Sequence, residues 1–117
     1  MADIAPSKVT GNTSYGLFIN EDKLLAFCEE VMDLISEKLQ VKPHGVYSFD
    51  LKEDAYGNLK VTEINVRHMA YSGIMARVGF DLIGDTVKYL DGEAPSIQNG
   101  RYHFDEDHIL LRDVDIE

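Results

Sequence analysis

Three residues of this chain, Asp50, Glu63 and Asn65, carry the oxygen atoms that a divalent cation prefers as ligands. Mg²⁺ is usually held by one or two carboxylates and fills its other positions with water and substrate phosphate. Two facing carboxylates repel each other unless a cation lies between them or solvent screens them. The three residues therefore predict a site for Mg²⁺ or Mn²⁺, if the fold brings them onto one face.

A β-hairpin is the element that would bring these residues together. Residues 45–54 and 59–66 alternate in polarity, and turn-forming residues separate them. If the loop is the four residues Ala55–Asn58, Asp50 lies directly opposite Glu63, and the asparagine lies on the same face. The polar residues and the apolar residues then occupy opposite faces of the hairpin.

The register of this hairpin leaves two alternatives open. The four-residue loop pairs Phe49 with Ile64 and Leu51 with Thr62 on the apolar face. A five-residue loop would instead place Asp50 opposite Thr62. The acidic residues could also form only a solvated face, which is common in a chain this acidic.

A long helix precedes the hairpin. From Glu21 onward, apolar residues recur at spacings of three and four until Pro43 and Gly45 end the pattern, and Asn20 is the expected N-cap. The resulting stripe, suited to pack on the apolar face of the hairpin, contains Leu24, Cys28, Val31, Met32, Ile35 and Leu39. We expect an α+β fold in which helices pack on one face of an antiparallel sheet.

The remaining segments predict shorter elements of a single domain over residues 15–117, preceded by a flexible arm or frayed strand over residues 1–14. The expected elements are a strand over Tyr15–Ile19, helices over Gly73–Val78 and Phe80–Leu90, and paired strands over Tyr102–Phe104 and His108–Arg112.

Composition excludes several function classes. The 117 residues include 11 Lys+Arg and 21 Asp+Glu, and the net charge of −10 disfavours a nucleic-acid partner. No apolar run is long enough to span a bilayer, and the N-terminus lacks the pattern of a signal peptide. The single cysteine, Cys28, cannot form an intramolecular disulfide. We therefore expect a cytoplasmic protein that binds neither nucleic acid nor membrane.

The sequence of residues 63–67, Glu-Ile-Asn-Val-Arg, resembles the Glu-x-Asn-x-Arg motif of ATP-grasp ligases. That family places a metal ligand on the preceding strand, and Asp50 lies thirteen residues before Glu63. The stretch from Lys8 to Gly92 is similar to the C-terminal part of the ATP-grasp module, and closest to carbamoyl-phosphate-synthase-like proteins. The resemblance implies the fold of a C-terminal ATP-grasp subdomain.

The resemblance also implies a function for each matching residue. Asp50, Glu63 and Asn65 would hold the Mg²⁺ ions that bridge the phosphates of ATP. Arg67 would be the catalytic residue that faces the γ-phosphate or an acyl-phosphate intermediate, and the substrate would be a carboxylate. Metal charge and a guanidinium offset the repulsion between the two reacting anions.

The chain lacks the adenine pocket and the glycine-rich loop of such a ligase, which implies a missing N-terminal half as its partner. By itself we expect the chain to fold, to bind Mg²⁺ weakly, to show no ligase activity and to self-associate through uncovered surfaces. The alternative is a non-catalytic interaction or assembly module that retains this fold.

Other residues are weaker candidates. His68 could line the substrate region or be ordinary polar surface, and Met69–Gly73 could shape a substrate pocket or simply connect two elements. Cys28 lies on the apolar stripe, which favours a core thiol over a nucleophile. The acidic run Asp105–Asp107 lacks the spacing of a calcium loop and is expected to be a solvated turn.

Overall fold

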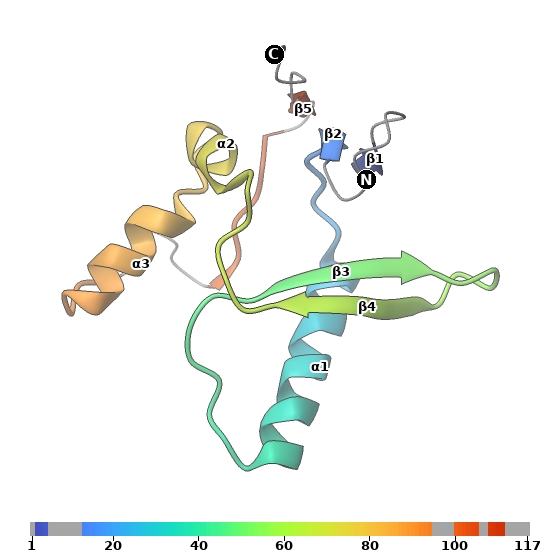
Figure 1. The fold of residues 1–117 in the computed structure, drawn as a ribbon, viewed down its shortest axis with the longest axis horizontal. Helices are drawn as coiled ribbons and strands as arrows, with labels where there is room; N and C mark the ends of the chain where they lie inside the picture. The colour runs from blue at the N-terminus through green and yellow to red at the C-terminus, as the bar shows by residue number, and fades with distance from the viewer. Residues whose placement is uncertain (1, 5–12, 95–99, 106–107, 112–117) are drawn as a thin grey trace. The chain divides into compact units, whose positions relative to one another are not determined.

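A computed structural model describes residues 2–4, 13–94, 100–105 and 108–111 (Figure 1). The described residues form three α-helices and five strands, which confirms the α+β class. The strands form two antiparallel sheets rather than the one sheet expected, with strand orders β1-β2-β5 and β3-β4. The chain divides into two compact units, Glu21–Ala70 and the combination of Met1–Asn20 with Tyr71–Glu117.

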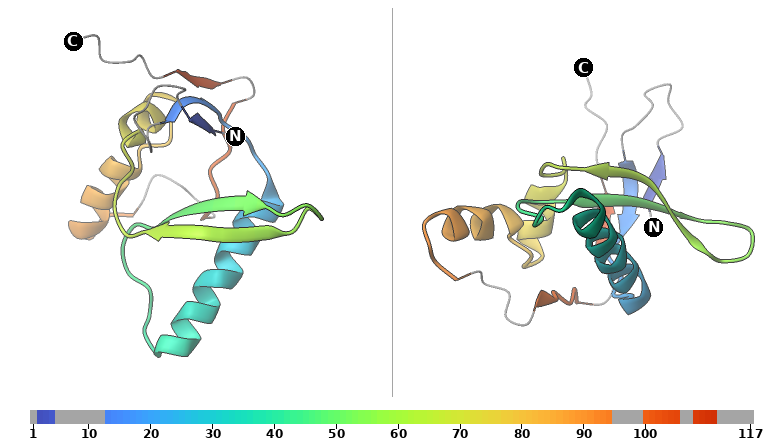
Figure 2. Two further views of the ribbon diagram at one scale, coloured as in Figure 1. Left: turned by 45° about the vertical axis from the view of Figure 1, so that its right-hand side comes forward. Right: turned by 90° about the horizontal axis from the view of Figure 1, so that it is seen from below.

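The unit Glu21–Ala70 consists of one helix and one hairpin. Helix α1 spans Asp22–Leu39, and the hairpin strands are β3, Ser48–Glu53, and β4, Leu59–Asn65. The hairpin lies across α1 in the views of Figures 1 and 2. The helix and the hairpin predicted from sequence are therefore confirmed, although β3 begins three residues later than expected.

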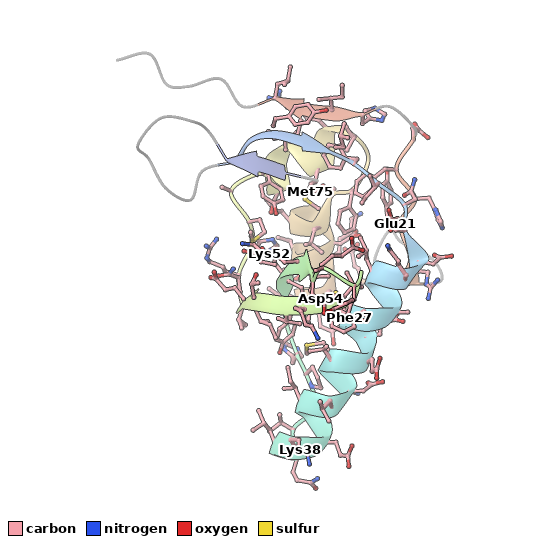
Figure 3. All side chains as sticks on the ribbon, turned by 90° about the vertical axis from the view of Figure 1, so that its right-hand side faces the viewer. Glu21, Phe27, Lys38, Lys52, Asp54 and Met75 are labelled. Carbon is pink, nitrogen blue, oxygen red and sulfur yellow. The ribbon has the colours of Figure 1, made fainter. Side chains whose placement is uncertain are left out.

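The apolar stripe of α1 is half-buried. Five of its predicted members are half-buried, namely Leu24, Cys28, Val31, Met32 and Ile35, whereas Leu39, at the last turn, is 65% exposed. Phe27, which was not predicted as part of the stripe, is half-buried as well. Phe27 lies beside the hairpin and Lys38 lies at the far end of the helix (Figure 3). Lys23 Nζ donates a hydrogen bond of 3.1 Å to Glu53 Oε1, which ties α1 to the end of β3. The stripe of α1 and the apolar face of the hairpin are thus both only half-buried.

The expected N-cap of α1 is wrong. Glu21, not Asn20, occupies the N-cap position, and it makes no side-chain capping bond. The amide of Asn20 instead bonds the backbone of Phe104 twice: Nδ2 donates to the carbonyl oxygen at 2.7 Å, and Oδ1 accepts from the N–H at 2.9 Å. An asparagine amide can replace a strand neighbour in this way, because it offers one donor and one acceptor.

The other unit contains a small sheet. Strand β1, Ala2–Ile4, and strand β5, Ile109–Leu111, both pair antiparallel with the central strand β2, Thr13–Leu17. The strand expected at Tyr15–Ile19 is thus confirmed for its first three residues. Of the arm expected over residues 1–14, the described residues 2–4 and 13–14 are strand.

The expected pairing of the two C-terminal strands is wrong. Residues 102–104 form no strand, and β5 pairs with β2. The side chains of Tyr102 and Phe104 pack with Phe18 and Phe80, with ring centroids 4.7 to 5.9 Å apart. Ring packing and the bond from Asn20 therefore replace ladder pairing for this segment.

Two short helices complete this unit. Helix α2 spans Ser72–Arg77 and helix α3 spans Leu82–Leu90. They match the two predicted helical stretches, with Gly79 between them. Asp81 caps α3, because its carboxylate accepts a 2.9 Å bond from the N–H of Gly84. Asn99 of the predicted Asn99-Gly100 turn lies outside the described residues, as do the last two residues of the acidic run.

Helix α3 has an unusual distribution of exposed side chains. Asp85 is only 7% exposed, whereas Ile83, Val87 and Leu90 are 43%, 61% and 74% exposed. The three apolar residues follow helical spacing and share one face. Among the described residues, Leu110, at 6%, is the only buried hydrophobic side chain. This unit therefore leaves an apolar helical face uncovered.

None of the helices among the described residues combines the length and the low polarity that crossing a membrane would require.

Candidate functional site

The hairpin register places Asp50 directly opposite Glu63, as predicted, but the loop and the ladder that produce this pairing differ from the prediction. Five residues, Asp54–Asn58, join the strands, so that Glu53 pairs with Leu59. The predicted four-residue loop is therefore wrong, and so is the predicted pairing of Leu51 with Thr62.

A β-bulge restores the predicted register. The ladder shifts by one residue between Asp50 and Leu51, and Thr62 is the extra residue on β4. Its hydroxyl donates a 2.9 Å bond to the carbonyl oxygen of Asp50, which fixes the bulge at this position. Without the bulge, the five-residue loop would place Thr62 opposite Asp50. Thr62 is thus the residue that positions Glu63.

Three cross-strand pairs form the polar face of the hairpin. They are Ser48 with Asn65, Asp50 with Glu63, and Lys52 with Lys60. The other face carries Phe49 opposite Ile64 and Leu51 opposite Val61, and all four of these side chains are half-buried. The structure therefore brings Asp50, Glu63 and Asn65 onto one face, because directly opposed residues share a face.

The charges on this face remain largely unpaired. Asp50, Glu63, Lys52 and Lys60 are exposed, and Lys52 projects from the side of the hairpin away from α1 (Figure 3). Of these four residues, only Lys60 forms an ion pair within the described part of the chain; its Nζ lies 3.7 Å from Asp54 Oδ2. The two carboxylates and Lys52 thus keep their charges available to a ligand.

The loop that closes the hairpin is organised by Asp54. Its Oδ1 accepts bonds of 2.9 Å from the backbone N–H groups of Tyr56 and Asn58, and both carboxylate oxygens accept from Asn58 Nδ2. Gly57 has a φ of 81°, which the turn requires and which glycine adopts without strain. The Asn58 side chain first, and then the backbone N–H of Asn58, lower the pKa of Asp54 to about 2.

This lowered pKa predicts loosening of the loop in acid. The folded pKa of Asp54 lies below its ordinary value of 3.8, so its contribution is present above about pH 4 and is lost as the pH falls towards 2. We expect the amide protons of Tyr56 and Asn58 to titrate with a midpoint near pH 2 in NMR spectra. Asp54→Asn should abolish this titration and lower stability at neutral pH. A midpoint near 4 would contradict the capping arrangement.

Arg67 lies beyond the end of β4, two residues after Asn65. It is exposed, and its Nη1 donates a 3.3 Å bond to the carbonyl oxygen of His68. His68 is half-buried, and its Nδ1 is buried without a hydrogen-bond partner in the described part of the chain. The structure thus places Arg67 in the bend that follows the strand, and not within the β3-β4 ladder.

Two features of the site were missed at the level of sequence. One is the lysine pair. The place of Lys52 on the polar face could have been read from the period of two, because Lys52 is two residues from Asp50 on β3, whereas the place of Lys60 depends on the bulge. The other is the role of Asp54 in organising the loop. The residue types Asp54, Gly57 and Asn58 are an ordinary turn signal, from which this role could have been predicted.

The remaining candidates give no second site. Cys28 is half-buried, and burial first, then the charge of Glu29, raises the pKa of its thiol, which argues against a reactive thiolate. In the described residues, no three His, Cys, Asp or Glu side chains are grouped so as to hold a metal ion. The set on the hairpin is two carboxylates and one amide.

Comparison of the chain with protein-family models, with curated proteins and with solved structures finds no match.

Proposed function

We propose that this chain is the Mg²⁺- and ATP-phosphate-binding C-terminal portion of an ATP-grasp carboxylate ligase of the carbamoyl-phosphate-synthase-like kind. The observation that supports the proposal is the pairing of Asp50 with Glu63 at a β-bulge, with Asn65 on the same face. The helix α1 beside the hairpin supports the finer assignment of the fold as a C-terminal ATP-grasp subdomain (Figure 1).

The donor set of the hairpin fits a hard divalent cation. Asp50 and Glu63 are directly opposed, exposed and without an ion pair among the described residues, so that a cation would relieve their repulsion. Asn65 adds a neutral oxygen on the same face. When bound, Mg²⁺ would supply charge neutralisation for transfer of a phosphoryl group to a carboxylate.

Arg67 and His68 would act next to this face. The guanidinium of Arg67 is exposed, so it can bind a phosphoryl oxygen and offset its charge. The bond from Arg67 to the carbonyl of His68 holds the guanidinium near the end of β4. The residues of the chain thus bind and orient an anionic group, whereas a nucleotide-binding partner half would hold the adenine.

The metal part of the proposal is tested by a titration of the chain with Mn²⁺. Paramagnetic broadening in NMR spectra should be strongest for residues 48–52 and 60–65 and should be lost in Asp50→Asn/Glu63→Gln. The thermal midpoint of this variant should hold or rise, because one repulsive pair disappears. In the assembled ligase, the same variant should lower turnover by roughly a hundredfold or more.

The matched control is Asp33→Asn/Glu37→Gln, which removes the same two residue types from exposed positions of α1. This variant should keep the broadening of the hairpin. Equal loss of broadening in both variants would show that the cation responds only to net charge. Unfolding of Asp50→Asn/Glu63→Gln in the absence of metal would show that the two acids are structural.

A second candidate function is supported by helix α3. Its face of Ile83, Val87 and Leu90 is exposed, although a carboxylate on the other side of the same helix is buried. Contiguous exposed apolar residues are typical of protein interaction surfaces. An assembly module that binds through α3 would account for this face without any catalytic role for the hairpin.

A further inference from the structure

Two like-charged pairs lie side by side on the polar face of the hairpin. Asp50 is opposite Glu63, and at the next position of the same face Lys52 is opposite Lys60. Like charges directly opposite each other destabilise a sheet, whereas opposite charges stabilise it. An exchange of only two neighbouring residues would convert both pairs into ion pairs. We therefore expect the observed arrangement to be the less stable of the two.

The structure does not relieve this repulsion with internal ion pairs. Nitrogen and oxygen atoms of Lys52, Asp50 and Glu63 form no ion pair in the described part of the chain, and Lys60 reaches only Asp54. The acidic pair and the basic pair thus stay separate, although they occupy successive positions on one face. A ligand with a positive part and a negative part would relieve both repulsions at once.

We propose that Lys52 and Lys60 form the anion-binding half of this face and hold the phosphate groups of a metal-bound polyphosphate, while Asp50 and Glu63 hold the cation. The ligand class is the complex of a divalent cation with a nucleoside triphosphate or an inorganic triphosphate. This inference rests on the proposed function, because it takes the acidic pair as the cation position.

The chemistry of the four side chains fits this ligand. Lysine is a common phosphate-binding residue, and its long stem lets the ammonium group reach a phosphate oxygen beyond the hairpin surface. The chain carries a net charge of −10, so free polyphosphate is repelled unless a cation accompanies it. The face should therefore bind the metal complex better than either the metal or the polyphosphate alone.

The test is an NMR titration of the chain with inorganic triphosphate, with and without Mg²⁺. In the presence of Mg²⁺, the hairpin signals should shift at millimolar triphosphate, and without it they should not. Lys52→Gln/Lys60→Gln should weaken binding of the complex about fivefold to tenfold, with unchanged Mn²⁺ broadening at Asp50 and Glu63. Added salt should weaken it further, because exposed charges are screened.

The control variant is Lys38→Gln/Lys42→Gln, which removes two exposed lysines elsewhere in the same unit. Equal weakening in both variants, or none in Lys52→Gln/Lys60→Gln, overturns the inference and leaves the cation site standing. If Mn²⁺ does not broaden the hairpin signals of the unmodified chain, the proposed function is overturned, and the inference is overturned with it. Titration with MgATP separates the two ligand sources. Equal binding of MgATP and Mg²⁺-triphosphate supports recognition of the phosphate groups, whereas binding of MgATP without binding of Mg²⁺-triphosphate overturns the assignment of the lysine pair as a phosphate site.

Discussion

Replacing Gly79 with alanine is expected to destabilise the chain by about 2–3 kcal/mol. Gly79 follows α2 with a φ of 99°, and a methyl group there would overlap the hydroxyl of Tyr102. That hydroxyl donates a 2.6 Å bond to the carbonyl oxygen of Val78. The substitution therefore combines the cost of a left-handed conformation, about 1–2 kcal/mol, with the loss of one hydrogen bond, about 1 kcal/mol. Denaturant unfolding of the whole chain measures the change.

Two control variants separate these costs. In a Tyr102→Phe background, Gly79→Ala should cost only the conformational part, because the hydroxyl is gone. Gly73→Ala, on α2 itself, meets no atom within 4 Å and should hold or raise stability, because alanine favours helix. A change below about 0.5 kcal/mol for Gly79→Ala, within the range of ordinary surface substitutions, would show that the turn between α2 and α3 does not depend on this glycine.

The strong backbone signal at Gly79 explains why the order of elements could be predicted. The N–H of Gly79 bonds the carbonyl of Ala76 at 3.1 Å, and that of Phe80 bonds Met75 at 2.9 Å. This is the Schellman arrangement, in which glycine in a left-handed conformation ends a helix. A glycine between two apolar periodic segments carries that information in the sequence itself. The boundary between α2 and α3 was therefore predictable from one residue.

The sequence predicted which residues pair across the hairpin near Asp50, but not the loop length or the bulge that produce this pairing. The pairing of Asp50 with Glu63 is confirmed, although the loop has five residues and not four. The extra residue in the loop and the extra residue at Thr62 cancel, so the residues from Asp50 to Ser48 keep their predicted partners on β4. A bulge depends on a local bond, here from Thr62 to the carbonyl of Asp50, that alternation of polarity does not reveal.

Contacts between distant segments could not be predicted at all. Asn20 has the residue type and position of an N-cap, and the sequence offers no sign that Phe104, 84 residues away, takes its amide instead. Tyr102 and Phe104 alternate as strand residues do, but their rings pack in an aromatic cluster. Local pattern was overridden in both cases by tertiary contacts, which a single sequence does not contain.

The candidate site was predictable to the extent that it depends on local alternation. Glu63 and Asn65 share a face because they are two residues apart on one strand, and Asp50 shares it because it is directly opposite Glu63. Lys52 shares this face for the same reason, whereas Lys60 reaches it only because the bulge at Thr62 shifts the ladder by one residue. The two lysines change the chemistry of the face from a purely acidic surface to one with both charges. The pairing of acid with acid and of lysine with lysine along this face is the feature that needs a functional reason.

Exchange of Asp50 and Lys52, in the double variant Asp50→Lys/Lys52→Asp, tests that reason directly. The variant has the same composition and net charge, and it places a lysine opposite Glu63 and an aspartate opposite Lys60. Both repulsive pairs become attractive, so stability should rise by about 1 kcal/mol. The thermal midpoint of the chain should rise by several degrees. Binding of Mg²⁺-triphosphate should be lost, because no acidic pair or basic pair is left.

A control exchange, Glu37→Lys/Lys38→Glu at the far end of α1, also preserves composition and should leave binding unchanged (Figure 3). Two results would contradict the argument. A lower midpoint for the hairpin exchange would mean that like-charge pairing is not a cost in this structure. Retained binding would mean that the ligand responds to total charge and not to its arrangement. A rise in stability together with loss of binding is the result expected if the arrangement of charges on this face lowers stability and is needed to bind a metal-bound polyphosphate.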